Sequence, residues 1–278
     1  LALSVDHRIR LGDAKAIVGT SAGSIVGSLI ALGFEAGDLA ALVSDADRHV
    51  DPSLVPLGVT FDRGDVPAAP NMLRLLRPPT VASTAAGVRM IMRRQFTAAA
   101  VNGLRRGAFD LTSRLAFLET VDWGSLKADL RVCAARSATG ERTVFTAPTG
   151  ARLVDAVSAS CAVPGVMRPV AIGADEYVDG GVVSPTNLDA IEGTDCGLVV
   201  VISPMSGSRS RSALGRFSSA HAQWKLAREV SALRRRHQIL VVEPAASLSA
   251  TVVDDALDPS RNGPILTATF LGSSLPAW

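Results

Sequence analysis

The amino-acid sequence predicts an α/β fold in which helices flank a mostly parallel central sheet. Short apolar runs alternate along the chain with longer segments of helical periodicity, and such alternation is typical of parallel sheets covered by helices. The chain has 278 residues, of which 47% are hydrophobic and 19% charged. This composition is that of a globular protein with a sizeable core. We therefore expect one α/β domain over residues 1–278.

The expected strands are short apolar runs, some of them rich in β-branched residues. In chain order they are Leu1–Leu3, Ala16–Val18, Leu130–Ala134, Thr143–Thr146, Glu176–Val178, Leu198–Ser203 and Gln238–Val242. The expected helices, whose apolar residues recur at helical spacing, are Ala22–Leu32, Asp38–Arg48, Leu153–Cys161 and Ser218–Arg236. Ser218 and Ser219 are the candidate N-caps of the last helix.

A long excursion interrupts this alternation. Prolines recur between Asp51 and Pro79, which indicates irregular structure. The following segment, Val81–Leu104, has one apolar helical face. It is either a helix packed on the sheet, or else a cap over an active site or a surface that contacts lipid. The basic residues around that face are Arg89, Arg93 and Arg94. We favour packing for the helix and expect a cap or lid over about residues 51–110.

Charge and cysteine content exclude several classes of protein. The 28 basic and 26 acidic residues are interspersed, so no electrostatic feature favours a nucleic-acid partner. The three cysteines, Cys133, Cys161 and Cys196, lie far apart, which argues against a disulfide framework and against paired metal ligands. We expect a reducing, cytoplasmic environment and no metal.

One uncharged stretch, Ala16–Phe34, just reaches the length of a membrane span at 19 residues. Its clustered glycines and serines favour a buried strand, a turn and a helix instead. The chain begins at Leu1 without a methionine, so a removed leader stays an open alternative.

The segment Gly19-Thr20-Ser21-Ala22-Gly23 matches the pattern G-x-S-x-G between an expected strand and an expected helix. A serine at such a turn projects its hydroxyl at a helix N-terminus, where the helix dipole stabilises negative charge. The backbone N–H of Ala22 is then a candidate oxyanion donor. The alternative is a glycine-rich turn that merely lets a helix pack closely on a strand. The flanking elements favour Ser21 as a nucleophile.

A nucleophilic serine needs a base, and the sequence offers two kinds. His221 and His237 satisfy the order of a lipase-type Ser-Asp-His triad only loosely. Asp179 is the better candidate because it ends a short expected strand and precedes Gly180 and Gly181, and the ends of parallel strands are where open sheets place their sites. Taken alone, Asp-Gly is also an ordinary hairpin signal.

With Ser21 and Asp179 paired, the sequence resembles the patatin-like phospholipases. The resemblance rests on the elbow Val18–Gly27, the block Ala156–Gly165 and the segment Tyr177–Val183. It implies a patatin-like α/β fold and a Ser-Asp dyad without histidine, formed by Ser21 and Asp179. Gly180 and Gly181 complete the family's D-G-G motif, and Cys161 stands where the family often has serine.

One departure concerns the oxyanion hole. The family carries a glycine-rich G-G-G-x-R-G loop after its first strand, whereas Leu1–Ser4 is followed by Val5–Arg8 without glycines. Only 12 residues separate Leu3 from Ala16, which is the lower limit for a parallel crossover of roughly 10 to 12 residues. Either the protein has lost the loop, or residues that carry it are missing from this sequence between Leu3 and Ala16. We favour the second alternative.

The resemblance implies a serine lipid acyl hydrolase, a phospholipase or esterase that cleaves fatty acyl esters through an acyl-enzyme and needs no cofactor. The expected partner is a lipid or an ester substrate at a membrane surface, with peripheral membrane contact and no nucleic acid. Two alternatives stay open, namely a catalytically impaired lipid-binding protein of the same fold and a hydrolase with a Ser-Asp-His triad.

Overall fold

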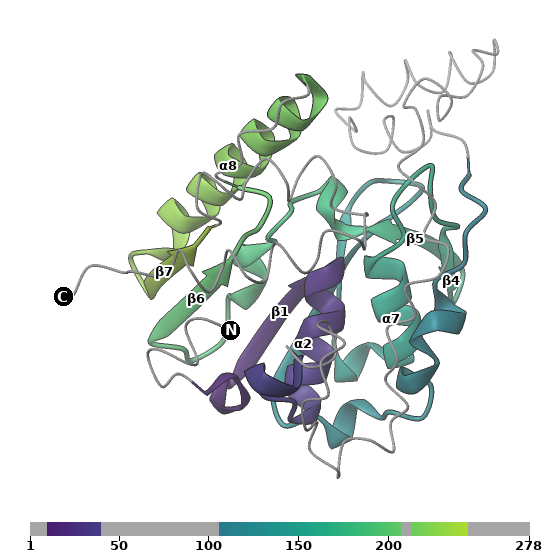
Figure 1. Cartoon of the computed structure of the whole chain (residues 1–278), viewed down its shortest axis with the longest axis horizontal. Helices are drawn as coiled ribbons and strands as arrows, with labels where there is room; N and C mark the ends of the chain where they lie inside the picture. Colours follow the sequence, from purple (N-terminus) through teal and green to yellow (C-terminus); the bar gives the residue numbers. More distant parts are fainter. Residues whose placement is uncertain (1–9, 40–105, 207–212, 244–278) are drawn as a thin grey trace.

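The structure is a computed structural model that describes residues 10–39, 106–206 and 213–243 (Figure 1). Over these ranges it contains two β-sheets with helices packed against them. The α/β class expected from the sequence is confirmed. The described helices include none that is both long and apolar enough to cross a bilayer.

The first sheet has five strands in the order β1-β2-β5-β4, with β3 paired to β2. Its strands are β1 (Ala16–Thr20), β2 (Asp129–Arg136), β3 (Arg142–Phe145), β4 (Val170–Ile172) and β5 (Asp175–Asp179). Only β1 and β2 pair in parallel, whereas β2–β3, β2–β5 and β4–β5 are antiparallel. This sheet is therefore mixed, not mostly parallel as the alternation of elements had suggested.

Two α-helices cover this sheet and bury its core. They are α2 (Ala22–Leu32) and α7 (Leu153–Ser160), which contact each other and the strands (Figure 1). One apolar cluster joins residues such as Leu130 and Val132 of β2 to Val154 and Val157 of α7. Short 3-10 helices connect the larger elements: η1 (Leu11–Asp13), η3 (Thr112–Leu118), η4 (Trp123–Ser125), η5 (Ala147–Thr149), η6 (Gly180–Val182) and η7 (Leu188–Ile191).

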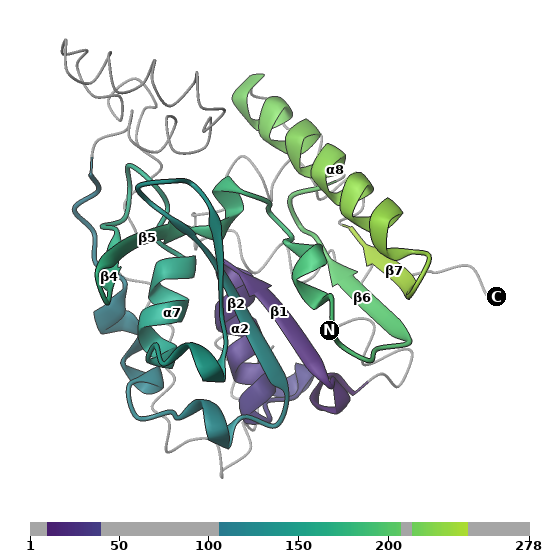
Figure 2. The same ribbon diagram turned by 180° about the vertical axis from the view of Figure 1, so that it is seen from behind.

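The second sheet is a parallel pair formed by β6 (Leu198–Ile202) and β7 (Gln238–Val242), with the long helix α8 (Ala213–Leu233) between them in sequence. Val199 and Val201 of β6 pack with Leu226 and Leu233 of α8. The same cluster includes Val18 of β1, so the β6–α8–β7 unit lies beside the first sheet (Figure 2).

The sequence predicted most of these elements closely. α2 and β7 have the expected limits, and β1 extends the expected strand by two residues. The prediction missed the three-residue strand β4. Its candidate N-caps for α8 were wrong, because Ser218 and Ser219 lie inside a helix that begins at Ala213. The expected strand Leu1–Leu3 and most of the expected helix Asp38–Arg48 lie outside the described residues.

The pairings of β2 bring the ends of β1 and β5 together. Val132 and Cys133 pair with both β1 and β3, so these two strands flank opposite edges of β2. Ala134 and Ala135 pair with both β3 and β5, which puts β5 on the same edge as β1. Thr20 pairs with Cys133 and Asp179 with Ala134. The carboxyl ends of β1 and β5 therefore meet head to head on one edge of β2.

Candidate active site

The first component of the site is the turn between β1 and α2. Ser21 has φ 54° and ψ −128°, a region that non-glycine residues rarely occupy and that costs about 1–3 kcal/mol. A Cβ atom at Gly19 would lie 2.6 Å from the Ser24 Cα and 2.7 Å from the Gly23 carbonyl oxygen. Only glycine therefore permits this close approach of helix and strand, as the G-x-S-x-G pattern predicts.

Hydrogen bonds from distant segments hold the backbone of Ser21. Its N–H donates to the Ser160 Oγ at 3.0 Å, and the Ser160 hydroxyl in turn donates to the Cys133 carbonyl of β2 at 2.6 Å. The Ser24 hydroxyl donates to the Ser21 carbonyl at 2.7 Å. These contacts fix a backbone conformation that is unfavourable in isolation, and they leave the Ser21 hydroxyl free of that task.

Ser21 lies beside Asp179. Ser21 is the N-cap residue of α2, but its side chain makes no capping bond to the helix. Hydrogen bonding from the Ser21 side chain instead lowers the pKa of the Asp179 carboxyl. The structure thus brings together the serine and the acid that the sequence had paired, although β5 is antiparallel to β2 and does not end as a parallel strand would.

Asp179 is a buried carboxyl group with few polar neighbours. Its residue is 6% exposed, and burial raises the pKa of its carboxyl to about 6, while the hydrogen bonds from Ser21 and from the Gly181 N–H oppose that rise. The Gly181 bond measures 2.7 Å. With this pKa the carboxyl group is ionised at neutral pH and is a stronger base than an exposed aspartate. A base works best when its pKa lies near the working pH, so this environment suits Asp179 to that role.

The first glycine of the D-G-G motif, Gly180, is required because the chain passes very close to β2 there. A Cβ atom there would lie 2.4 Å from the Cys133 carbonyl oxygen, so a side chain at this position would push the loop after Asp179 away from β2. Gly181 contributes its N–H to the carboxylate. Both glycines therefore act on the position or charge of Asp179.

The backbone N–H that the sequence predicts as an oxyanion donor, that of Ala22, lies at the start of α2. Ala22 and Gly23 are exposed, and they are the first two residues of α2, where N–H groups have no partner within a helix. An added Cβ at Gly23 would meet no atom within 4 Å, so there is open space beside the turn. The segment in which the family has its glycine-rich loop, Val5–Arg8, lies outside the described residues.

The two cysteines near the site are unsuited to act as nucleophiles. Burial raises the pKa of Cys133 and of Cys161 to about 12 each, and the charge of Asp179 adds to the rise at Cys161. The Cys161 Sγ lies 3.7 Å from the Ser24 Oγ. Both thiols are therefore protonated at neutral pH, and Cys161 packs beneath the elbow.

The two candidate histidines lie elsewhere in the described fold. The His221 ring is on α8, beside the Trp224 ring at a centroid distance of 6.1 Å. The His237 Nδ1 contacts the Cys196 carbonyl at 2.5 Å, just before β7 and β6 begin. Ser21, by contrast, follows the carboxyl end of β1, which runs in the same direction as β6 (Figure 1). His237 therefore lies near the amino ends of its strands, whereas Ser21 lies at the carboxyl end of β1.

Sequence reasoning missed two polar residues at this site. Ser160 belongs to the block that carried the family resemblance, yet nothing in the pattern marked it as the partner of the Ser21 N–H. Asn187 bonds to both Thr20 and Gly180, and no motif indicated it. Within the described ranges no group of three His, Cys, Asp or Glu side chains is arranged to bind a metal ion. Arg89, Arg93 and Arg94 lie outside these ranges, as does the expected cap up to residue 105.

Comparisons with known proteins identify the family. The model of the family described as patatin-like phospholipase matches residues 9–191 of this chain, which include both Ser21 and Asp179. Among solved structures, VipD from Legionella pneumophila is similar with a TM-score of 0.40 and 13% identity, over 97% of this chain and 63% of that chain. The chain thus spans less than two thirds of the length of VipD, and no curated protein matches it. Because the family match covers more than half of its residues, this chain belongs to the patatin-like phospholipases.

Proposed function

We propose that this protein is a serine lipid acyl hydrolase, a phospholipase or esterase that cleaves fatty acyl esters with a Ser21–Asp179 dyad. The observation that carries the proposal is the placement of Ser21 beside the buried Asp179, where the carboxyl ends of β1 and β5 meet on β2. Membership of the patatin-like phospholipase family supports the substrate class.

In the first half of the reaction, Asp179 accepts the proton of Ser21 as the Oγ attacks the ester carbonyl. The carbonyl oxygen becomes an oxyanion, which N–H groups at the start of α2 stabilise. The tetrahedral intermediate then collapses, the C–O bond to the alcohol breaks, and the alcohol leaves with the proton held by Asp179. The product of this half is an acyl-enzyme on Ser21.

In the second half, a water molecule takes the place of the alcohol. Asp179 removes a proton from this water as its oxygen attacks the acyl carbonyl, and the fatty acid leaves as Ser21 recovers its proton. One carboxylate serves both halves, which a pKa of about 6 suits, because the group must both accept and return a proton near neutral pH.

Two further parts of the proposal concern where the enzyme works. The substrate is a lipid or an ester at a membrane surface, and the enzyme is cytoplasmic and binds membranes peripherally. Arg89, Arg93 and Arg94 are the proposed contacts with anionic head groups, each adding roughly 1 kcal/mol of attraction near such a surface. Changing all three to glutamine should reduce co-sedimentation with anionic vesicles at low salt, and equal binding of both proteins would contradict this part.

The test of the central proposal is labelling with a fluorophosphonate, which reacts only with activated serines. The unmodified protein should be labelled at Ser21, as mapped by mass spectrometry of its peptides, and should hydrolyse soluble acyl esters. Ser21→Ala should show neither reaction, with circular dichroism and melting temperature as controls for folding. Absence of labelling on the folded protein would favour the alternative of a catalytically impaired lipid-binding protein, and loss of activity in His221→Ala or His237→Ala would favour the triad.

A further inference from the structure

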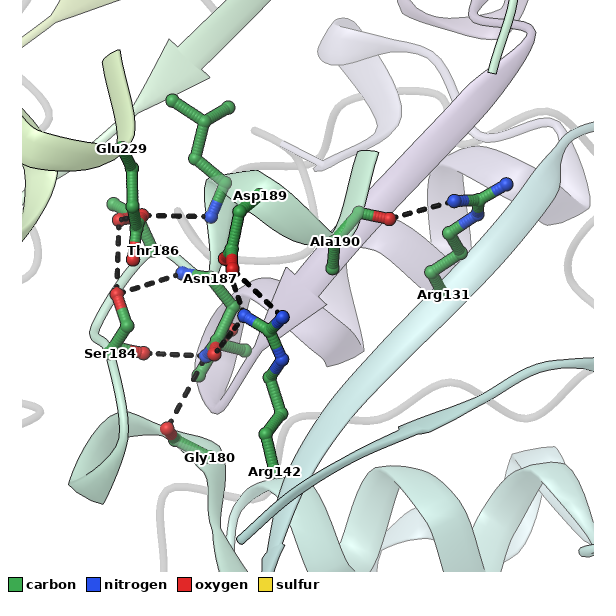
Figure 3. A network of polar contacts seen from close by, with 11 residues as sticks. Arg131, Arg142, Gly180, Ser184, Thr186, Asn187, Asp189, Ala190 and Glu229 are labelled. Atoms are coloured by element: carbon green, nitrogen blue, oxygen red, sulfur yellow. Dashed lines mark hydrogen bonds and ion pairs between the residues drawn. The ribbon is translucent and has the colours of Figure 1, made fainter. Parts of the chain in front are cut away.

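Asn187 lies at the centre of a polar network between the two loops of the proposed dyad (Figure 3). Its side chain is fully buried, and its backbone is left-handed with φ 46°, a conformation that asparagine tolerates better than most residues. The Nδ2 atom lies 2.5 Å from the Ser184 carbonyl, 3.0 Å from the Thr20 Oγ1 and 3.3 Å from the Gly180 carbonyl. A buried amide with this many partners is a strong constraint on all of them.

Two of these partners are adjacent in sequence to the dyad. Thr20 immediately precedes Ser21, and Gly180 immediately follows Asp179. An amide NH₂ has two hydrogens, which the three acceptors Ser184, Thr20 and Gly180 share. The Nδ2 of Asn187 therefore joins the end of β1 to the end of β5.

The amide has one favoured orientation. Its Oδ1 accepts a hydrogen bond from the Arg142 guanidinium at 3.4 Å, and Arg142 is itself held by two contacts to the Asp189 carboxylate. Rotating the amide by half a turn would place its oxygen against three other oxygens and its NH₂ against a cation. The ion pair thus keeps the Nδ2 pointed at Thr20 and Gly180.

The loop that carries Asn187 is anchored on both sides. The Glu229 carboxylate of α8 accepts hydrogen bonds from the Thr186 hydroxyl at 2.7 Å and from the Leu188 N–H at 2.9 Å. The Asn187 N–H donates to the Ser184 Oγ at 3.1 Å. The backbone on either side of the amide is thereby attached to a long helix, which makes Asn187 a fixed support.

Pairing with β2 does not by itself join the end of β1 to the end of β5. Thr20 and Asp179 pair with neighbouring residues of β2, yet β1 and β5 are not paired with each other. Ser160 attaches the Ser21 backbone to β2, and the Asp179 N–H donates to the Ala162 carbonyl, but neither contact joins the two strand ends to each other. Asn187 supplies such a contact through Thr20 and Gly180.

We propose that Asn187 is the positioning residue of the Ser21–Asp179 pair, acting through Thr20 and Gly180 to hold the hydroxyl within hydrogen-bond reach of the carboxylate. This inference rests on the proposed function. A misplacement of about 1 Å in such a pair reduces turnover by roughly a hundredfold, so the side chain has a defined task although it touches neither substrate nor reacting atom.

The decisive experiment alters the acceptor and leaves Asn187 in place. Thr20→Val keeps the shape of the side chain but removes its hydroxyl, whereas Thr20→Ser keeps the hydroxyl. With a soluble p-nitrophenyl ester, kcat of Thr20→Val should fall roughly tenfold to a hundredfold with KM nearly unchanged, and Thr20→Ser should recover most of that loss. Thr194→Val is the matched control, because the Thr194 hydroxyl bonds to the Ile191 carbonyl at 2.7 Å away from the dyad.

A second readout separates positioning from general support of the fold. The Ser21 hydrogen bond lowers the pKa of Asp179, so a wider dyad should move the acidic limb of the kcat/KM profile to higher pH. Thr20→Val and Asn187→Leu should both show this shift, and the Thr194 variant should not. Asn187→Leu removes the amide without adding a charge and keeps the Thr20 hydroxyl, so agreement of the two variants assigns the effect to the amide.

The outcomes distinguish this inference from the proposed function. Normal kcat and an unchanged acidic limb in Thr20→Val, with Ser21 of the unmodified protein active, would overturn the positioning role alone. No Ser21-dependent labelling or hydrolysis in the unmodified protein would overturn both. If Asn187→Leu does not fold, the pair of Thr20 variants decides the matter.

Discussion

The surroundings of Ser21 and the β6–α8–β7 unit differ in their packing, which is strained and polar in the first region and regular and apolar in the second. Around Ser21 the chain accepts a positive φ, a buried carboxyl group and glycines pressed against backbone atoms. In the β6–α8–β7 unit two strands pair in parallel over five residues each, and aliphatic side chains fill the space beneath the helix. The first region fixes polar groups at some expense of stability, whereas the second contributes stability and supports the first through Glu229.

If this comparison is right, the largest effect on turnover should come from the acid of the first region. Asp179→Asn keeps the shape of the side chain and removes the base, so kcat should fall by roughly two to four orders of magnitude, the usual contribution of general-base catalysis. His221→Ala and His237→Ala are the controls and should differ little from the unmodified protein in ester hydrolysis. Near-normal activity of Asp179→Asn would contradict the proposal that Asp179 is the base.

In the second region the largest effect should be on stability. Leu233 and Leu226 of α8 are 1% and 5% exposed, and truncation of a buried leucine to alanine costs about 2–5 kcal/mol. Leu233→Ala should therefore lower the free energy of unfolding in urea by that amount while kcat per folded molecule stays the same. A loss of kcat that exceeds the loss of folded protein would show that the two regions are coupled more tightly than proposed.

A pair of glycines tests the two regions with the same chemical change. Gly180→Ala brings a Cβ within 2.4 Å of the Cys133 carbonyl, whereas at Gly197, just before β6, an added Cβ meets no atom within 4 Å. We expect Gly180→Ala to destabilise the protein by about 1–3 kcal/mol, as overpacking does, and to reduce turnover. Gly197→Ala should melt within a degree or two of the unmodified protein, and a similar melting temperature for both variants would contradict the close approach at Gly180.

The last expected effect is a gain of stability at the dyad. Burial raises the pKa of Asp179 from 3.8 to about 6, so the folded state holds this proton more tightly than the unfolded chain does. The contribution of Asp179 to stability is therefore most favourable below about pH 4 and is lost as the pH rises through about 6. Asp179→Asn removes this penalty, so above pH 7 it should be more stable by roughly 1–3 kcal/mol.

The pH dependence of that gain is the check. Urea unfolding of both proteins between pH 4 and pH 8 should show the difference shrink as the pH falls toward 4. A constant difference across this range would mean that Asp179 does not titrate with a raised pKa in the folded state.

The same comparison explains what could be predicted from the sequence. Periodicity located β6, β7 and α2 within a residue, because these elements are regular and their apolar faces repeat. The motifs located Ser21 and Asp179 because the turn at Ser21 and the loop after Asp179 each require glycine at a fixed offset. A periodic pattern and a local steric requirement are both visible in a short window of sequence.

The features that the sequence did not predict depend on contacts between residues far apart in the chain. Ser160 and Asn187 bond to residues 139 and 167 positions away, and no local pattern specifies such partners. The antiparallel direction of β5 follows from its pairing with β2, which a strand's own composition does not encode. The serines of α8 misled the prediction because serine lowers helix stability by less than about 0.7 kcal/mol relative to alanine, too little to end a helix.

The head-to-head meeting of β1 and β5 makes any activity of the proposed dyad a late event in folding. The elbow serine leaves the ribosome before its partners, because the acid and the Ser160 hydroxyl follow more than a hundred residues later. Pairings of such long range form slowly, because loop-closure entropy opposes them until the strands are joined. The proposed hydrolysis therefore cannot begin before β5 has docked on β2. The time course of fluorophosphonate labelling during refolding would therefore record the docking of β5 on β2, well after the initial collapse.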